Sequence, residues 1–360
     1  MQDGASSQDW IAPDDGVKGL VSIVIPTCNR SAYLTETIES AFAQEHRPIQ
    51  ILVVDDASTD DTESVVSGLQ DRAPAGIELL YFKQTKSGAP AARNRGVRNT
   101  TGEFIVFMDD DDVFSDNFLA THLKCFASQP SANLSFSRWQ RFRKEESHYV
   151  LVDFKGTKPD GATTPLEAFF FGWEILLQSC LVRRSLVSEA GPWQLDLKKS
   201  QDLDYKVRLL GAPSCKVVDN SDATIFYRMH ASSITGSLNA EKLKSYVDVF
   251  DYVEEVAQRR DDFESLHSTF ARYLWRHAYW LTGHGKHSEA MQLIEKAKGY
   301  DKDVCKRNGP LLARVLGRFG LEGIASKVLY NLFQFKQQIS KPPVVTMGKV
   351  SEIPSCKPLD

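Results

Sequence analysis

At 360 residues the chain is long enough to bury at least one full core, and its length favours a large domain with a smaller one. Hydrophobic residues at 42% and charged residues at 25% are ordinary globular values, which excludes a fibrous or generally disordered chain. A formal net charge of −4 argues against nucleic acid as the main partner, because phosphate backbones attract basic surfaces.

The cysteines and the N-terminus indicate a reducing compartment. Six cysteines are scattered without a CxxC pair, which favours free thiols over a disulfide framework or a zinc site. The N-terminus is polar and acidic and lacks the apolar core of a signal peptide, so we expect residues 1–17 to be flexible. The chain contains no run of about 18 or more apolar residues, the length that predicts a membrane span. We therefore expect a cytoplasmic protein.

Residues 21–112 alternate strand-like and helix-like segments. Short apolar runs rich in β-branched residues predict strands at 21–25, 49–54, 77–82 and 104–108. Apolar residues at helical spacing predict a helix between each pair of strands. This alternation predicts an α/β fold with a mainly parallel sheet that is flanked by helices.

Polar residues follow three of these strands, at residues 26–30, 55–56 and 109–112. In parallel sheets, ligands bind at the carboxyl ends of the strands. We therefore expect the three polar segments to lie along one edge of the sheet and to form the functional site.

The rest of the chain changes character twice. Residues 130–235 mix strand-like runs with a helix after Gln201, and the pattern becomes wholly helical from about residue 238. We predict a catalytic domain at 18–237 and a helical C-terminal region at 238–340. Four prolines in residues 341–360 predict a disordered tail.

Four consecutive aspartates, Asp109 to Asp112, follow the apolar strand at 104–108. Neighbouring charges about 4 Å apart repel by roughly 1 kcal/mol in water and by about 4 kcal/mol near protein. A divalent cation relieves this repulsion, and carboxylate oxygens suit Mg²⁺ or Mn²⁺ that carries a diphosphate. A solvated acidic turn is the alternative, since runs of like charge usually face water. The apolar strand before the run favours the metal site.

Two further segments have both a structural and a functional interpretation. Asp55 and Asp56 either cap the following helix or accept hydrogen bonds from a nucleotide base or ribose. The segment 88–94 opens a helix whose N-terminus is suited to phosphate, and Arg93 adds a positive charge there. The alternative for Arg93 is an ordinary surface residue.

Asp202 lies at the start of another predicted helix, where it either caps the helix or acts as a general base. An ionised carboxylate there could accept the proton of a sugar hydroxyl. Two other classes of enzyme are disfavoured, because the chain has neither the GxSxG elbow of serine hydrolases nor the GxGxxG of dehydrogenases.

Five segments, in order and spacing, resemble the family 2 glycosyltransferases with the A-type fold. They are VSIVIPTCNR, ILVVDDASTDDT, GAPAARNRGV, GEFIVFMDDDD and SQDLDYKVRLL, within roughly residues 20–230. The resemblance implies an A-type nucleotide-diphospho-sugar transferase fold. It also implies inverting transfer of a sugar from a nucleotide diphosphate donor, with UDP-sugars favoured, to an acceptor hydroxyl in surface polysaccharide or glycan biosynthesis.

The resemblance implies roles for individual residues. Asp202 matches the catalytic base of the family. Donor-binding candidates are Pro26, Thr27, Asn29, Arg30, Asp55, Asp56, Arg93 and Asp110. Candidates for binding Mg²⁺ or Mn²⁺ are Asp109, Asp111 and Asp112, together with His230 of the YRMH segment.

Three departures from the family pattern bear on function. Cys28 stands where a tyrosine often stacks on the base, and Gln201 replaces the glutamate that precedes the catalytic aspartate. The QxxRW signature of processive polysaccharide synthases is absent, which favours transfer of a single sugar. A nucleotidyltransferase and a catalytically inactive sugar-nucleotide binding module remain as alternatives.

Residues 304–341 contain seven lysines and arginines but only one acid, Glu322. One interpretation is an interfacial helix that rests on anionic lipid, peripheral to the inner face of the membrane, and serves a glycan or lipid-linked acceptor. The other is a helix packed on the catalytic domain with a solvated basic face.

Overall fold

The computed structural model describes residues 10–11, 16–145, 148–197, 200–230, 240–305 and 345–347. Contacts divide the chain into two compact units. The first unit contains residues 1–157, 174–238 and 343–360, and the second contains residues 158–173 and 239–342. Residues 158–173 thus group with the C-terminal helices, whereas the sequence pattern places them in a contiguous 18–237 domain. Most of the N-terminus predicted to be flexible lies outside the described residues.

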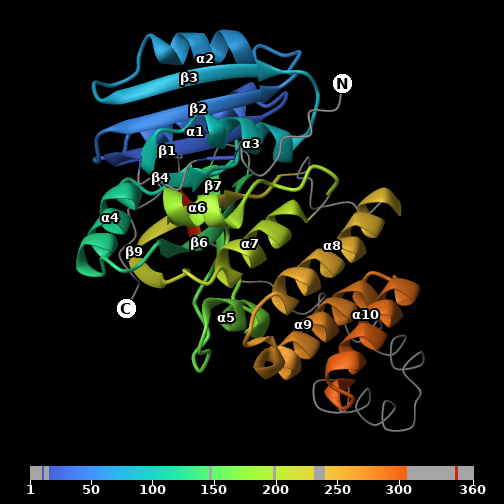
Figure 1. Ribbon diagram of the computed structural model, residues 1–360. Coiled ribbons are helices and arrows are strands. Elements are labelled where there is room, and N and C mark those ends of the chain that lie inside the picture. The colour runs from blue at the N-terminus through green and yellow to red at the C-terminus, as the bar shows by residue number, and fades with distance from the viewer. Residues whose placement is uncertain are drawn as a thin grey trace. The chain divides into compact units, whose positions relative to one another are not determined.

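Four parallel strands form the N-terminal part of the sheet in the first unit (Figure 1). They are β3 (Ile77–Gln84), β2 (Ile49–Asp56), β1 (Val17–Thr27) and β4 (Gly102–Phe107), in that spatial order. Every residue of β2 is buried, as expected for a strand covered on both faces. The chain runs outward from β1 to β3 and then returns to β4 on the other side of β1. Such a reversal of strand order marks the ligand-binding crevice of α/β sheets.

Three helices cover this part of the sheet: α1 (Ser31–Phe42), α2 (Thr62–Gln70) and α3 (Ala89–Arg98). Helices α1 and α2 share a core with alternate residues of β1, such as Ile23 and Ile25. Helix α3 packs on the opposite face, where a Cβ atom at Gly96 would lie 2.4 Å from Val24 Cγ1. Glycine at this position therefore lets α3 approach the sheet closely. The α/β architecture predicted from the sequence is confirmed.

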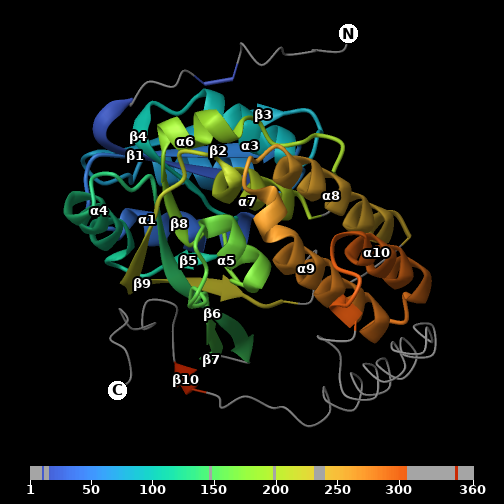
Figure 2. The ribbon, with the colours of Figure 1, turned by 60° about the horizontal axis from the view of Figure 1, so that its bottom comes forward.

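The remaining strands extend the sheet with mixed pairing (Figure 2). They are β5 (Val113–Phe114), β6 (Leu134–Glu145), β7 (His148–Lys155), β8 (Cys180–Arg183), β9 (Val217–Arg228) and β10 (Val345–Met347). Strand β8 is antiparallel to both β4 and β6, whereas β9 is parallel to β6. Helices α4 (Phe118–Ser128), α6 (Arg184–Ala190) and α7 (Gln201–Gly211) complete the described part of this unit.

Strand β10 pairs antiparallel with β7, within the tail that the prolines predict to be disordered. Its β-branched residues suit an extended backbone, and β7 offers it an edge for pairing. At residues 345–347 the structure therefore differs from the predicted disorder, and the rest of the 341–360 tail lies outside the described residues.

The described part of the second unit is helical, as the sequence predicts for the C-terminal region. Its helices are α5 (Pro165–Phe171), α8 (Ala240–Gln258), α9 (Phe263–Gly283) and α10 (His287–Tyr300). Aromatic rings of α5 and α9 form part of its core, with Phe170 against Phe270 and Tyr273. In the described part of the chain, no helix has the length and apolar character needed to cross a membrane. The basic segment from Lys306 to Lys341 lies outside the described residues.

Candidate active site

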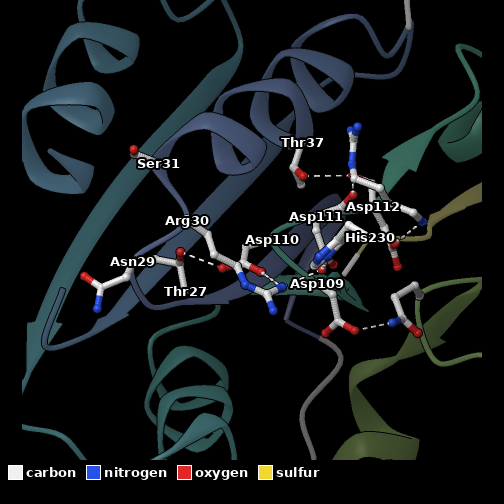
Figure 3. A network of polar contacts seen from close by, with 12 residues as sticks. Thr27, Asn29, Arg30, Ser31, Thr37, Asp109, Asp110, Asp111, Asp112 and His230 are labelled. Atoms are coloured by element: carbon white, nitrogen blue, oxygen red, sulfur yellow. Dashed lines mark hydrogen bonds and ion pairs between the residues drawn. The ribbon is translucent and has the colours of Figure 1, made fainter. Parts of the chain in front are cut away.

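The predicted polar segments meet at the carboxyl ends of β1, β2 and β4. Thr27 is in register with Asp55 of β2, and the four aspartates follow β4 on the other side of β1. Figure 3 shows Thr27, Arg30 and the aspartates gathered at this edge. The parallel topology thus brings together side chains that are more than 80 residues apart in the sequence, as between Thr27 and Asp110.

Asp110 is buried and is held by the segment that follows β1. Thr27 Oγ1 donates a hydrogen bond of 2.7 Å to Asp110 Oδ2, and Arg30 Nη1 lies 3.3 Å from Asp110 Oδ1. Burial, and then the charge of Asp111, raise the pKa of Asp110 to about 7, although Arg30 opposes the shift. The Asp110 carboxyl group is therefore shielded from water and has a second carboxylate beside it.

Asp111 is contacted from two sides by nitrogen atoms. Arg30 forms an ion pair with Asp111 Oδ2, and His230 Nε2 lies 2.8 Å from the same oxygen. The His230 ring stacks on Tyr33 of α1, with the ring centroids 5.0 Å apart. The structure therefore places His230 beside a predicted metal-binding carboxylate (Figure 3).

Asp112 is completely buried and only partly satisfied. Its Oδ1 accepts a 3.0 Å hydrogen bond from the backbone N–H of Arg228, but no donor in the described residues reaches Oδ2. Burial, followed by the charges of Asp111 and Asp109, raises the pKa of Asp112 well above its ordinary value. The Arg228 guanidinium donates two hydrogen bonds: Nε to the backbone carbonyl oxygen of Asp111, at 2.7 Å, and Nη2 to Glu36 Oε2, at 2.6 Å.

Three of these carboxylates fit a divalent cation. Asp109, Asp111 and Asp112 each offer an oxygen, and the three oxygens lie within 4.8 Å of one another. Buried carboxylates with an unpaired oxygen are costly without a positive charge, and oxygen donors are the ligands that Mg²⁺ and Mn²⁺ prefer. A solvated acidic turn does not describe Asp112, because its carboxylate has no access to water.

Asp109 is tied to the opposite side of the site. Arg93 Nη2 donates a 2.7 Å hydrogen bond to Asp109 Oδ1, and Gln178 donates to the other carboxylate oxygen. The Arg93 guanidinium also lies over the Trp193 ring, 4.6 Å from its centroid. Arg93 is thus an internal partner of Asp109 and not merely a surface residue.

Asp202 lies in the first turn of α7, with its side chain 56% exposed. Its Oδ2 is 3.2 Å from Lys206 Nζ, one helical turn further along. Surrounding protein partly desolvates the group, which raises its pKa, but Lys206 and Arg93 together hold the pKa below its ordinary value. Asp202 also interacts electrostatically with Asp109, so the candidate base and the candidate metal site are neighbours.

Asp55 is completely buried and its two oxygens are both engaged. The backbone N–H of Ser58 donates to Oδ1 at 2.7 Å, and the Tyr81 hydroxyl donates to Oδ2 at 2.6 Å. These contacts fix the loop after β2 to the neighbouring strand β3.

Asp56 accepts four contacts from the end of β3 and the loop that follows it. Gln84 and the backbone N–H of Ser87 donate to Oδ1, whereas the N–H of Gly88 donates to Oδ2, and Lys86 lies 3.5 Å from Oδ2. Burial, the largest influence, raises the pKa of Asp56, but these donors together bring it below the ordinary value. Two amides before α3, where the sequence suggests a phosphate site, therefore already bind a carboxylate.

Two of the predicted donor-binding residues contact other parts of the site's framework. Asn29 Oδ1 accepts hydrogen bonds from the N–H groups of Thr59, at 2.8 Å, and Asp60, at 3.3 Å. In Figure 3 the Asn29 side chain points away from the aspartates. Pro26 is buried within β1, in register with Val54 of β2.

Sequence reasoning missed several residues that hold the site together. They are Glu36, Tyr81, Gln84, Lys86, Gln178 and Arg228. The residues near position 84 follow a fourth strand end, so the rule applied to the other three strands could have found them. Arg228 belongs to the YRMH segment, in which the family resemblance points to His230. No local pattern in the sequence marks Gln178.

The family described as glycosyl transferase family 2 matches residues 22–177. An uncharacterized glycosyltransferase from Haemophilus influenzae is 33% identical over 236 residues, which cover 64% of this chain and 86% of that protein. The chain covers a smaller part of other relatives, such as 21% of an uncharacterized glycosyltransferase from Rickettsia felis.

Two solved structures are similar over most of their length. Staphylococcus aureus TarS 1–349 in complex with UDP-GlcNAc has a TM-score of 0.66 and 15% identity, covering 92% of this chain and 97% of that chain. The mannosyltransferase PcManGT from Pyrobaculum calidifontis, in complex with GDP-Man and Mn²⁺, has a TM-score of 0.52 and 17% identity. This match covers 91% of this chain and 86% of that chain. The A-type fold expected from the sequence is confirmed.

Proposed function

Since the chain belongs to glycosyl transferase family 2, we propose that it is a metal-dependent, inverting transferase that moves a single sugar from a nucleotide diphosphate to an acceptor hydroxyl. We propose a UDP-sugar as the donor, which the UDP-GlcNAc bound to the similar TarS structure supports. We propose a glycan or a lipid-linked glycan as the acceptor, in the synthesis of a surface polysaccharide or glycan.

The convergence of Asp109, Arg93 and Asp202 supports this proposal most directly. Asp202 comes from a helix far along the chain, yet it interacts electrostatically with both residues at the sheet edge. A group that accepts a proton and a group that offsets charge on a leaving diphosphate must lie on either side of a reacting sugar. We assign the first task to Asp202 and the second to a cation held by Asp109, and the proximity of the two residues supports this assignment.

A divalent cation would be held by Asp109, Asp111 and Asp112, whose oxygens cluster within 4.8 Å. When bound, it supplies positive charge that offsets the negative charge developing on the departing diphosphate. The Mn²⁺ in the similar PcManGT structure supports the proposal of a divalent cation. Arg30, which contacts Asp111, would add a second positive charge near a diphosphate bound at this site.

Asp202 accepts the proton of the acceptor hydroxyl while that oxygen attacks the anomeric carbon of the donor sugar. The bond between that carbon and the diphosphate oxygen breaks, and the nucleoside diphosphate leaves from the opposite face with inversion. Lys206 and Arg93 keep Asp202 ionised before the reaction, so that it is ready to accept a proton. Its exposed side chain gives an acceptor access to the carboxylate.

The test is the Asp202→Asn variant, which keeps the shape of the side chain but removes the base. We expect transfer from UDP-sugars to fall by at least about 100-fold, the contribution typical of a general base. Calorimetry should show unchanged binding of the donor with Mn²⁺. Asp116→Asn, which alters an exposed aspartate between β5 and α4, is the matched control and should leave transfer unchanged. Near-normal turnover by Asp202→Asn would contradict the assignment of the base.

The same assay separates the rival functions. A panel of nucleotide sugars is incubated with Mn²⁺ or with EDTA, and the released nucleotide is identified. A transferase releases a nucleoside diphosphate only with metal, whereas a nucleotidyltransferase acts on these nucleotide sugars only when pyrophosphate is added, and then releases a nucleoside triphosphate and a sugar 1-phosphate. A protein that binds the nucleotide sugar without any turnover would instead be an inactive binding module.

A further inference from the structure

Lys86 lies at the carboxyl edge of the sheet, on the loop between β3 and α3. Its ammonium group is 2.8 Å from the sulfur of Cys28, which follows β1, and 3.5 Å from Asp56 Oδ2, at the end of β2. The side chain is 66% exposed, so it does not serve the hydrophobic core. Lys86 thus brings a positive charge over the ends of two strands to which it is not adjacent in sequence.

The acids at this edge are buried and already accept hydrogen bonds from the protein. Both oxygens of Asp55 are engaged inside the protein, and its side chain is completely buried. Asp56 accepts hydrogen bonds from Gln84 and from two backbone amides. Beside this buried pair the Lys86 ammonium is exposed, and it can only donate hydrogen bonds.

Position along the sheet indicates which part of a nucleotide reaches Lys86. The candidate metal site follows β4, and the strand order is β4, β1, β2, β3. With neighbouring strands about 4.8 Å apart, the end of β3 lies roughly 14 Å from that of β4. The base is at the opposite end of a nucleoside diphosphate from the phosphates. A donor whose diphosphate lies at the aspartates can therefore reach the β2 and β3 ends with its base.

We propose that Lys86 selects the nucleobase of the donor by donating a hydrogen bond to its exocyclic carbonyl oxygen. Uracil carries this oxygen at position 4 and guanine at position 6, whereas cytosine and adenine carry an amino group at those positions. An ammonium group attracts a carbonyl oxygen but meets another donor in an amino group. The inference rests on the proposed function, and it assigns the choice between bases to a cation that a loop positions.

The experiment measures the dissociation constants of UDP and CDP, with Mn²⁺ present, by calorimetry on the full chain. We expect the wild type to bind UDP at least about tenfold more tightly than CDP, since a hydrogen bond to a charged group has about that effect. Lys86→Met keeps most of the length of the side chain but removes the donor, and it should abolish most of this preference by weakening the binding of UDP. Lys86→Glu supplies an acceptor and should reverse the preference in favour of CDP.

Lys83→Met is the matched control, because Lys83 is an exposed lysine of β3 that pairs with Glu63 on the surface. It should leave the ratio of the two constants unchanged. An unaltered ratio in Lys86→Met overturns the inference while leaving the transferase proposal in place, because nucleotide binding persists. If neither UDP nor CDP binds to the wild type, and GDP and ADP do not bind either, the proposed function fails together with the inference.

Discussion

Two acidic groups lie at the same edge of the sheet, and their surroundings differ in kind. Asp55 and Asp56 receive hydrogen bonds from neutral donors of β3 and its loop, and the pKa of Asp56 is below its ordinary value. Asp110 and Asp112 lie in the four-aspartate run, where burial and neighbouring carboxylates raise their pKa values. The first pair is satisfied by the fold, whereas the second group has more negative charge than its donors offset.

The difference separates carboxylates whose oxygens all have donors from a run that includes a buried oxygen without one among the described residues. Both groups come after apolar strands, so placement at a strand end does not distinguish them. The number of hydrogen-bond donors distinguishes the two groups. A buried oxygen without a partner, such as Asp112 Oδ2, costs free energy unless a donor or a cation reaches it. We therefore expect neutralisation to have opposite effects on stability in the two groups.

The largest expected effect is that of Asp112→Asn. Loss of one metal ligand should lower Mn²⁺-dependent transfer by at least about 100-fold, since the metal contributes several kcal/mol to the transition state. In EDTA, the same variant should be more stable than the wild type by about 1 to 3 kcal/mol, because it removes a buried and unpaired carboxylate oxygen. Initial rates and denaturant unfolding measure the two effects.

Asp204→Asn is the matched control for burial. Asp204 is buried too, but it forms an ion pair with Arg208 at 2.6 Å. Neutralising it removes the charged partner of the partly buried Arg208, so this variant should be less stable than the wild type. If Asp112→Asn also lowers the stability in EDTA, the idea that the four-aspartate run has too few hydrogen-bond donors is contradicted.

Asp56→Asn tests the other half of the comparison. In the wild type, the donors around residue 56 all face a carboxylate oxygen. In the variant some of them face the NH₂ group of asparagine, which cannot accept a hydrogen bond, so we expect the free energy of unfolding to fall by about 1 to 3 kcal/mol. Because Asp56 positions the loop that carries Lys86, nucleotide binding should weaken as well. Unfolding in denaturant measures the stability, and an unchanged free energy would show that these donors are satisfied without the charge.

The sequence predicts the framework of the site for a physical reason. Apolar runs of five or six residues identify the buried strands, and parallel strands place their carboxyl ends together. Thr27, Arg30 and Asp110 therefore meet as expected, although they are up to 83 residues apart. The site residues inferred from the family resemblance, Asp202 among them, stay predictions until variants are assayed.

What the sequence does not predict is the partner of each carboxylate. The contact of Asp56 with the amides of Ser87 and Gly88 depends on the conformation of a loop, which no periodicity encodes. The ion pair between Arg228 and Glu36 joins residues 192 apart and depends on how β9 lies in the sheet. Whether an acid is satisfied is thus decided by tertiary contacts, and only the structure distinguishes the two groups.

The smallest expected effect is a dependence of the Asp56 contribution on pH. Its folded-state pKa lies below the ordinary value of 3.8, so the unfolded state binds more protons in the interval between the two values. The stabilisation is therefore fully present above about pH 4 and is lost as the pH falls through the folded-state pKa. The difference in unfolding free energy between the wild type and Asp56→Asn should shrink in that acidic range. Asp71→Asn, which alters an exposed aspartate after α2, controls for general acid effects. A difference that stays constant at low pH would mean that Asp56 stabilises the loop through its shape and not through its charge.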